Sequence, residues 1–330
     1  VLAALKTQDS THRTSKMFEA SLYKISDEVI PKLGIKTKEE ADTLVKDLKG
    51  ASYSVEHVER KELRKHPLPP FTTSTLQQEA TKKFGFSAKK TMFVAQGLYE
   101  RGLITYMRTD SVNVSKEALG AAHHWIKNNL PQEYHLDAPR VFKTKSKLAQ
   151  EAHEAIRPTN PEADAEALKL EKDDVKLYDL ISRRFLASQL PSAIFDTARI
   201  KVLARGTKPY TLIANGSMLR FDGFLKLWHM KFEEKELPEL KEKEGLDLTE
   251  LKPEQHFTEP PPRYNEASLI KTLEKYGIGR PSTYAPIISV IQDRNYVEKQ
   301  QGRFYPTEIG TLVNGVLKEH FPEIVDIQFT

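Results

Sequence analysis

The run His66-Pro67-Leu68-Pro69-Pro70 is the feature that most restricts how this chain can fold. Proline lacks a backbone N–H and fixes φ, so neither a helix interior nor a central strand continues through such a run. We therefore place a domain boundary there. Before it, residues 18–25 and 51–62 alternate between apolar and polar side chains, which is typical of strands.

Beyond the boundary the pattern becomes helical. Hydroxyl residues that can cap helices stand before stretches with apolar residues at helical spacing, and glycine or proline ends each stretch. The expected caps are at 72–74, Ser87 and Ser115, the expected ends are at Phe84-Gly85, Gly102 and Pro131, and a further helix is expected at 173–190. Between the second and third helices we expect a short extended run at 103–107.

Strand patterning returns from Ser192 to about residue 257, so the β region is split around a helical insert. We interpret its acidic stretch, 233–247, as a solvated loop or arm. After Pro260-Pro261-Pro262, Asn265 can cap a helix over 266–276. A helix, a glycine and a second helix recur at 76–105 and 269–298, and a hairpin at 299–306 gives the second unit a winged-helix outline. The fold class we predict is a multidomain α+β protein.

Composition excludes several classes of site. The chain has 50 Lys and Arg against 46 Asp and Glu, a net charge of +4, so any nucleic-acid surface must be local. With no Cys, disulfides, thiolate metal sites and cysteine nucleophiles are excluded. The apolar stretch at 285–291 is too short to cross a membrane. Because Val1 is not an initiator Met and no leader follows it, we expect a piece of a longer chain.

The segment Gly102-Leu-Ile-Thr-Tyr-Met-Arg-Thr-Asp-Ser111 brings a phenol, a guanidinium and a carboxylate together. A tyrosine hydroxyl can attack a phosphodiester if nearby cations stabilise its anion, and Arg108 shares a face with Tyr106 along an extended chain. The surrounding basic residues are Lys82, Lys83, Lys89, Lys90 and Arg101, with Glu100 among them. Alternatively, Tyr106 is a half-buried strand aromatic and Arg108 pairs with Asp110 at the surface.

Four segments closely resemble, in order and spacing, the type IA family of bacterial DNA topoisomerases. They are Phe71-Thr-Thr-Ser-Thr-Leu-Gln-Gln78, Gly102-Leu-Ile-Thr-Tyr-Met-Arg-Thr-Asp-Ser111, Gln150-Glu-Ala-His-Glu-Ala-Ile-Arg-Pro-Thr159 and Tyr276-Gly-Ile-Gly-Arg-Pro-Ser-Thr-Tyr284. The resemblance covers residues 66–330 well and the first sixty residues weakly. It implies an enzyme that cleaves one DNA strand through a 5′-phosphotyrosyl link, passes another strand through the break and reseals it, relaxing negative supercoils without ATP.

The resemblance also implies roles for residues of this chain. Tyr106 matches the nucleophile, and Arg108 matches the arginine that positions the scissile phosphate. His153 matches a histidine that assists near the active site. The positions expected to contact single-stranded DNA or to support that contact are Thr105, Arg280, Thr283 and Arg294.

In terms of this family, residues 1–66 and 193–262 form a split β arch, 67–192 the domain with the nucleophile, and 263–330 a truncated, winged-helix-like part of the base. The family binds magnesium through the acidic cluster of an N-terminal Toprim domain, and this chain contains no Asp-x-Asp. We therefore expect no metal ligands here and no complete relaxation by the chain alone. The resemblance further implies a monomer that works in the cytoplasm on the nucleoid, with no membrane contact.

Two other interpretations stay open. The chain could be a non-catalytic single-stranded DNA-binding module that uses its basic patch and exposed aromatic residues. It could also be the topoisomerase part of a larger fusion that resembles reverse gyrase.

Overall fold

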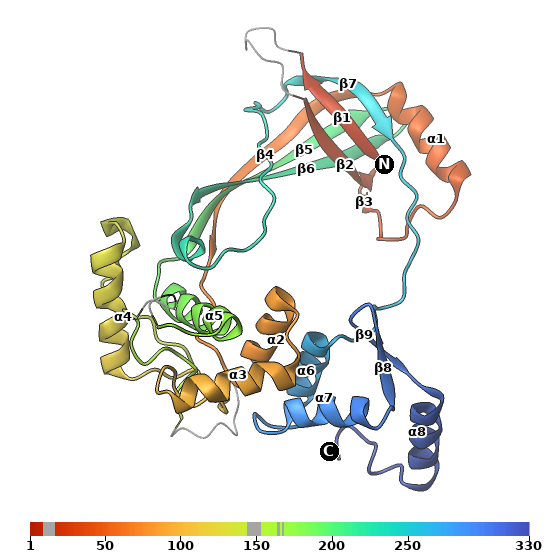
Figure 1. Ribbon diagram of the computed structural model, residues 1–330. Coiled ribbons are helices and arrows are strands. Elements are labelled where there is room, and N and C mark those ends of the chain that lie inside the picture. The colour runs from red at the N-terminus through yellow and green to blue at the C-terminus, as the bar shows by residue number, and fades with distance from the viewer. Residues whose placement is uncertain (9–16, 144–152, 164–165, 167, 330) are drawn as a thin grey trace. The chain divides into compact units, whose positions relative to one another are not determined.

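The computed structural model describes residues 1–8, 17–143, 153–163, 166 and 168–329. The chain divides into two compact units, which Figure 1 traces from the N-terminus in red to the C-terminus in blue. The first, called the β unit here, contains residues 1–65, 192–222 and 230–259. The second, the helical unit, contains residues 66–191, 223–229 and 260–330.

The β unit is built on one antiparallel sheet with the strand order β1-β7-β4-β5-β6-β2-β3. Its strands are β1 (Leu2–Thr7), β2 (Met17–Ile25), β3 (Glu28–Val29), β4 (Ser52–Lys65), β5 (Ala193–Arg205), β6 (Pro209–Phe221) and β7 (Gly245–Lys252), and its helix is α1 (Lys38–Lys49). Because β1 also pairs with β2, the pairings close on themselves and enclose a core that includes Leu5, Val202 and Leu212.

The register of β4 and β5 explains why the β region is split in the sequence. These strands pair from Ser52 with Arg205 to Lys65 with Ala193. The helical insert therefore leaves the sheet after Lys65 and returns at the residue paired with it. The predicted boundary at the proline run and the predicted strands on both sides are confirmed.

The helical unit contains α2 (Thr73–Phe84), α3 (Ala88–Glu100), α4 (Lys116–Asn129), η1 (Gln132–Tyr134), α5 (Lys172–Ser188), η2 (Gly223–Lys226), α6 (Glu266–Tyr276), α7 (Tyr284–Asp293), β8 (Val297–Gln300), β9 (Arg303–Pro306) and α8 (Glu308–His320). The expected caps are present, with Thr72, Ser87, Ser115 and Asn265 each accepting a backbone N–H of the first turn. The expected hairpin is also present, as β8 and β9 pair across Gln301 and Gly302.

Three expectations need correction. Residues 223–229, assigned to the β arch, belong to the helical unit because Phe224 and Trp228 bury their rings there. The acidic stretch 233–247 is not wholly solvated, since Leu240 packs in the core of the β unit and β7 begins at Gly245. The extended run at 103–107 forms no strand and contributes one isolated bridge, Ile104 to Pro158.

Candidate active site

The backbone on the N-terminal side of Tyr106 is paired with a distant segment. The Thr105 N–H donates to the Arg157 carbonyl at 2.9 Å, and the Thr105 hydroxyl donates to the Ala155 carbonyl at 2.7 Å. The same hydroxyl accepts the Arg157 N–H at 3.0 Å. These bonds bring His153, nearly fifty residues away in the sequence, to the side of Tyr106.

The ring of Tyr106 lies against two other rings. Its centroid is 5.4 Å from that of Tyr99, which meets it edge-on, and 5.8 Å from that of His153, which is tilted by 34°. The Tyr106 side chain is 39% exposed, and its hydroxyl has no hydrogen-bond partner among the described residues. Two neighbouring rings thus restrict the ring while the hydroxyl stays available.

The backbone on the other side of Tyr106 is fixed by Thr73, at the start of α2. The fully buried Thr73 hydroxyl lies 2.7 Å from the Met107 carbonyl, to which it donates, and accepts the Thr109 N–H at 2.9 Å. The Thr73 N–H also donates to the Thr109 carbonyl at 2.9 Å. Residues 107 and 109 are therefore buried and pinned, and Arg108 between them is exposed.

The guanidinium of Arg108 forms no hydrogen bond or ion pair with any described residue. The alternative of a surface pair between Arg108 and Asp110 is therefore not what the structure shows. A free cation on a fixed backbone, two residues from a free phenol, can bind an anionic group presented to both.

The segment that carries His153 is itself held in place. The Glu154 carboxylate accepts the Ser115 N–H at 3.1 Å and the Arg157 Nε–H at 2.7 Å. Residues 150–152 of the matched motif lie outside the described residues. The described part forms a brace between the start of α4 and the pairing with Thr105.

Arg280 and Thr283 meet at the turn between α6 and α7. The Arg280 Nη1 donates to the carbonyls of Gly277 at 3.1 Å and Gly279 at 2.7 Å, where a cation also complements the C-terminal end of α6. The Arg280 N–H donates to the Thr283 hydroxyl at 2.8 Å. Both glycines adopt positive φ, +73° and +78°, which favours glycine at these positions.

Tyr284 is buried at the start of α7, next to this turn. Burial raises the pKa of Tyr284; the charges of Glu274 and Asp110 raise it further, and that of Arg280 lowers it. Asp110 and Arg280 are thus close enough to act on one buried phenol. A hydrogen bond of 2.8 Å from Ser74 to Glu274 joins α2 to α6, the helix that precedes this turn. No described hydrogen bond or ion pair brings Arg294, at the end of α7, to the loop.

The sequence matches proteins of one family along almost its whole length. A family described as "DNA topoisomerase" matches residues 7–330. DNA topoisomerase 1 of Rickettsia felis is 47% identical over 99% of this chain and 44% of that protein. The chain belongs to the type IA family of bacterial DNA topoisomerases.

Two other proteins of this family are also similar to the chain. DNA topoisomerase 1 of Haemophilus influenzae is 48% identical over 89% of this chain and 34% of its own length. The structure of full-length topoisomerase I from Thermotoga maritima superposes with a TM-score of 0.78 at 33% identity, covering 100% of this chain and 53% of that one. The chain spans less than half the length of these curated relatives.

Sequence reasoning missed three residues that shape this type IA site. Thr73 stands among the candidate caps at 72–74, and no sequence pattern singles out Tyr99 or Glu154. Their contacts with Tyr106, with the loop at 107–109 and with Arg157 depend on tertiary structure. A hydroxyl just inside a helix start, where Thr72 already caps, was the one available signal for Thr73.

The described side chains and helices bear on metal binding and on membranes. Within the described ranges, no three His, Asp or Glu side chains come together as a metal site requires. In the part of the chain that the structure describes, no helix is long and apolar enough to span a bilayer.

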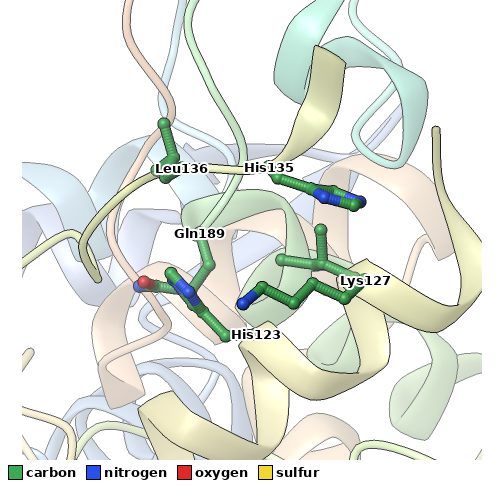
Figure 2. Close-up of a pocket in the computed structure, with 6 residues that line it drawn as sticks. His123, Lys127, His135, Leu136 and Gln189 are labelled. Atoms are coloured by element: carbon green, nitrogen blue, oxygen red, sulfur yellow. The ribbon is translucent and has the colours of Figure 1, made fainter. Parts of the chain in front are cut away.

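A small pocket away from the tyrosine loop is shown in Figure 2. It is lined by His123, Ile126, Lys127, His135, Leu136 and Gln189. Burial lowers the pKa of His123, and the nearby Lys127 and His135 lower it further. None of the expected site residues lines this pocket, and the lowered pKa of His123 favours the neutral form of that side chain.

Proposed function

We propose that this chain carries the DNA-cleaving tyrosine of a type IA topoisomerase and that Tyr106 is the nucleophile. Its hydroxyl oxygen attacks a backbone phosphorus of single-stranded DNA. The phenol gives up its proton, an O–P bond forms, the bond from phosphorus to the 3′ oxygen breaks, and that oxygen takes up a proton. The products are a 5′-phosphotyrosyl link and a 3′ hydroxyl.

The observation that carries this proposal is a free phenol and a free guanidinium on a loop pinned from both sides. Arg108 holds the non-bridging oxygens of the phosphate and stabilises the charge that develops on them in the transition state. The backbone on both sides of Arg108 is already held, so it needs no rearrangement during the reaction. His153 restrains the ring of Tyr106 and assists proton movement at the same place.

The DNA-contacting residues expected from the sequence divide into two groups. The hydroxyls of Thr105 and Thr283 are already used in hydrogen bonds within the protein, so we assign them positioning roles instead of DNA contacts. Arg280 has one nitrogen on the carbonyls of α6, and its Nη2 is left for a DNA phosphate. Arg294 is exposed, and we retain it as a phosphate contact.

We further infer the place of this chain in the whole enzyme. The β unit supplies the arch, α2 to α5 carry the nucleophile, and α6 to α8 with the β8–β9 hairpin form a winged-helix-like part of the base. Strand passage would then relax negative supercoils in the cytoplasm, with the protein acting as a monomer on nucleoid DNA. No step proposed here runs through magnesium.

The proposal is tested with a labelled single-stranded oligonucleotide that is mixed with the protein and quenched in SDS. A band shift that protease removes reports a covalent adduct. We expect the adduct with the wild type and with Tyr264→Phe, which changes another exposed tyrosine (47% exposed), but not with Tyr106→Phe. An adduct that survives Tyr106→Phe contradicts the proposal.

Arg108→Ala separates catalysis from simple binding. If Arg108 acts on the transition state, adduct formation falls by orders of magnitude while the affinity for DNA falls modestly and the salt dependence loses about one unit of slope. An equal, modest loss of both would instead make Arg108 a simple phosphate contact, and a wild type that binds single strands without forming an adduct would support a non-catalytic DNA-binding module. Because the acidic cluster of the family is absent from this sequence, we also infer that the chain alone does not relax a supercoiled plasmid.

A further inference from the structure

A buried arginine on α5 pairs with no carboxylate of the residues that the structure describes. Arg184 is 4% exposed and makes no ion pair with any described residue; its Nη1 is buried without a hydrogen-bond partner. Burial lowers the pKa of Arg184 to about 10, against a smaller opposing effect of Glu79, so it stays charged at neutral pH. Because burying an unpaired charge is costly, the position of this group calls for a role.

The contacts of Arg184 lie on one short segment and one aromatic ring beyond it. Its Nε donates to the Pro69 carbonyl at 2.7 Å. Its guanidinium carbon is 4.8 Å from the centroid of the Phe71 ring and 4.7 Å from that of Trp228. The two rings meet edge-on at 5.9 Å, and Lys83 also lies over Trp228. Two cation–π contacts thus replace the missing ion pair.

Phe71 leads from Arg184 directly to the tyrosine loop. The Phe71 carbonyl accepts the Ile156 N–H at 2.8 Å, and the segment at 155–157 pairs with Thr105. Two residues after Phe71, Thr73 holds the loop on the other side of Tyr106. Residues 71–73 are therefore the common support of both flanks of the nucleophile.

Pro69 and Trp228 both belong to the helical unit, and each lies close in the sequence to a point where the chain passes from one unit to the other. The chain first enters the helical unit after residue 65. It enters this unit again at residue 223 and leaves it after residue 229. Pro69 lies a few residues after the first of these entries, and Trp228 lies just before the chain leaves the helical unit after residue 229. The Arg184 guanidinium group therefore contacts the chain next to two connections between the units that are far apart in the sequence.

We propose that Arg184 is a positioning residue that couples these two connections to the loop of Tyr106. A displacement of either connection reaches Phe71 through the Arg184 guanidinium and alters the support at 71–73. This inference deepens the proposed function and rests on it for its catalytic consequence. The coupling itself is a structural property that can be measured without DNA.

The test compares Arg184→Met with Arg183→Met, a neighbouring arginine on the exposed side of α5 that pairs with Asp179. We expect Arg184→Met to speed amide hydrogen exchange at Ile156 and Thr105 by on the order of tenfold, from the loss of a charged hydrogen bond. Amides of β5 and β6 and the Arg183→Met protein should be unchanged. Equal exchange in both variants, or a uniform increase over the whole chain, overturns the proposal.

Two further readouts sharpen the result. In a Trp125→Phe background, where Trp228 is the remaining tryptophan, Arg184→Met should make Trp228 more accessible to acrylamide, and Arg183→Met should not. Adduct formation at Tyr106 should fall at least fivefold with single-strand affinity held within about twofold, from about 1 kcal/mol of lost positioning. Unchanged quenching or unchanged adduct formation counts against the coupling. A wild type that forms no adduct refutes the proposed function instead, and exchange still decides the coupling.

Discussion

Replacing Thr73 by valine tests whether the loop of Tyr106 depends on one buried hydroxyl. Valine keeps the shape and branching of threonine and removes only the hydroxyl. The Met107 carbonyl then loses a donor at 2.7 Å, and the Thr109 N–H loses an acceptor at 2.9 Å. Both residues are 1% exposed, so water does not replace the lost partner.

The expected cost follows from these two orphaned groups. A buried polar group without a partner costs about 1–3 kcal/mol, so the two groups orphaned by Thr73→Val should lower the unfolding free energy of the helical unit by about 2–6 kcal/mol. The loop also loses its anchor next to Arg108. Adduct formation should therefore fall more than the binding of single-stranded DNA does.

Urea unfolding followed by tryptophan fluorescence measures the stability effect, because Trp125 and Trp228 both lie in the helical unit. The matched control is Thr91→Val, at an equally buried threonine whose hydroxyl donates to the Ser87 carbonyl. That carbonyl keeps the Thr91 N–H, so about 1 kcal/mol or less is expected. If Thr73→Val costs no more than Thr91→Val, or leaves adduct formation intact, the reasoning is refuted.

Three further predictions concern charge. Hydrogen bonds from Tyr210, then from Thr207, lower the pKa of Asp47 to about 2. The ionised carboxylate therefore stabilises the folded state above pH 4, and this contribution is lost as the pH falls towards 2. Asp47→Asn should flatten the acid-unfolding curve in this range, and an unchanged curve would contradict the prediction. Because the pKa of His123 is lowered in the folded protein, its imidazole binds a proton more readily in the unfolded chain. Stability should therefore fall as the pH drops below about 6.5. His123→Gln should weaken that dependence in thermal melts at about pH 5 to 8. Glu266→Ala removes a buried carboxylate that accepts the Ala88 N–H at 2.6 Å and pairs with Lys299, which should cost about 3 kcal/mol in urea unfolding; a loss below 1 kcal/mol would show that the pair is dispensable.

Much of the local structure could be predicted because its causes are local. The proline run marks the departure from the sheet, and the polar caps (Thr72, Ser87 and Asn265) and glycine ends mark α2, α3 and α6. The strands on both sides of the insert show their alternation in the sequence. By contrast, β1 and its pairing with β7 could not be predicted, since the ring of pairings closes between segments more than two hundred residues apart.

The site was predictable in part. Tyr106 and Arg108 stand in one short motif, so their proximity follows from the sequence. The contact of Tyr106 with His153 requires the pairing of Thr105 with the segment at 155–157, which no local pattern encodes. The prediction of an extended run at 103–107 was wrong for the same reason. One isolated bridge, from Ile104 to Pro158, and the Thr73 hydroxyl fix this backbone, and no strand forms.

The most direct measurement of the central claim uses an oligonucleotide with sulfur in place of the 3′-bridging oxygen at one phosphate. The leaving thiolate needs no proton, so cleavage does not depend on an acid from elsewhere in the enzyme. The account predicts an SDS-stable adduct that retains a 3′-end label, with the DNA on the peptide containing Tyr106. Retention of a 5′-end label instead, attachment to another residue, or equal adduct with Tyr106→Phe would contradict it.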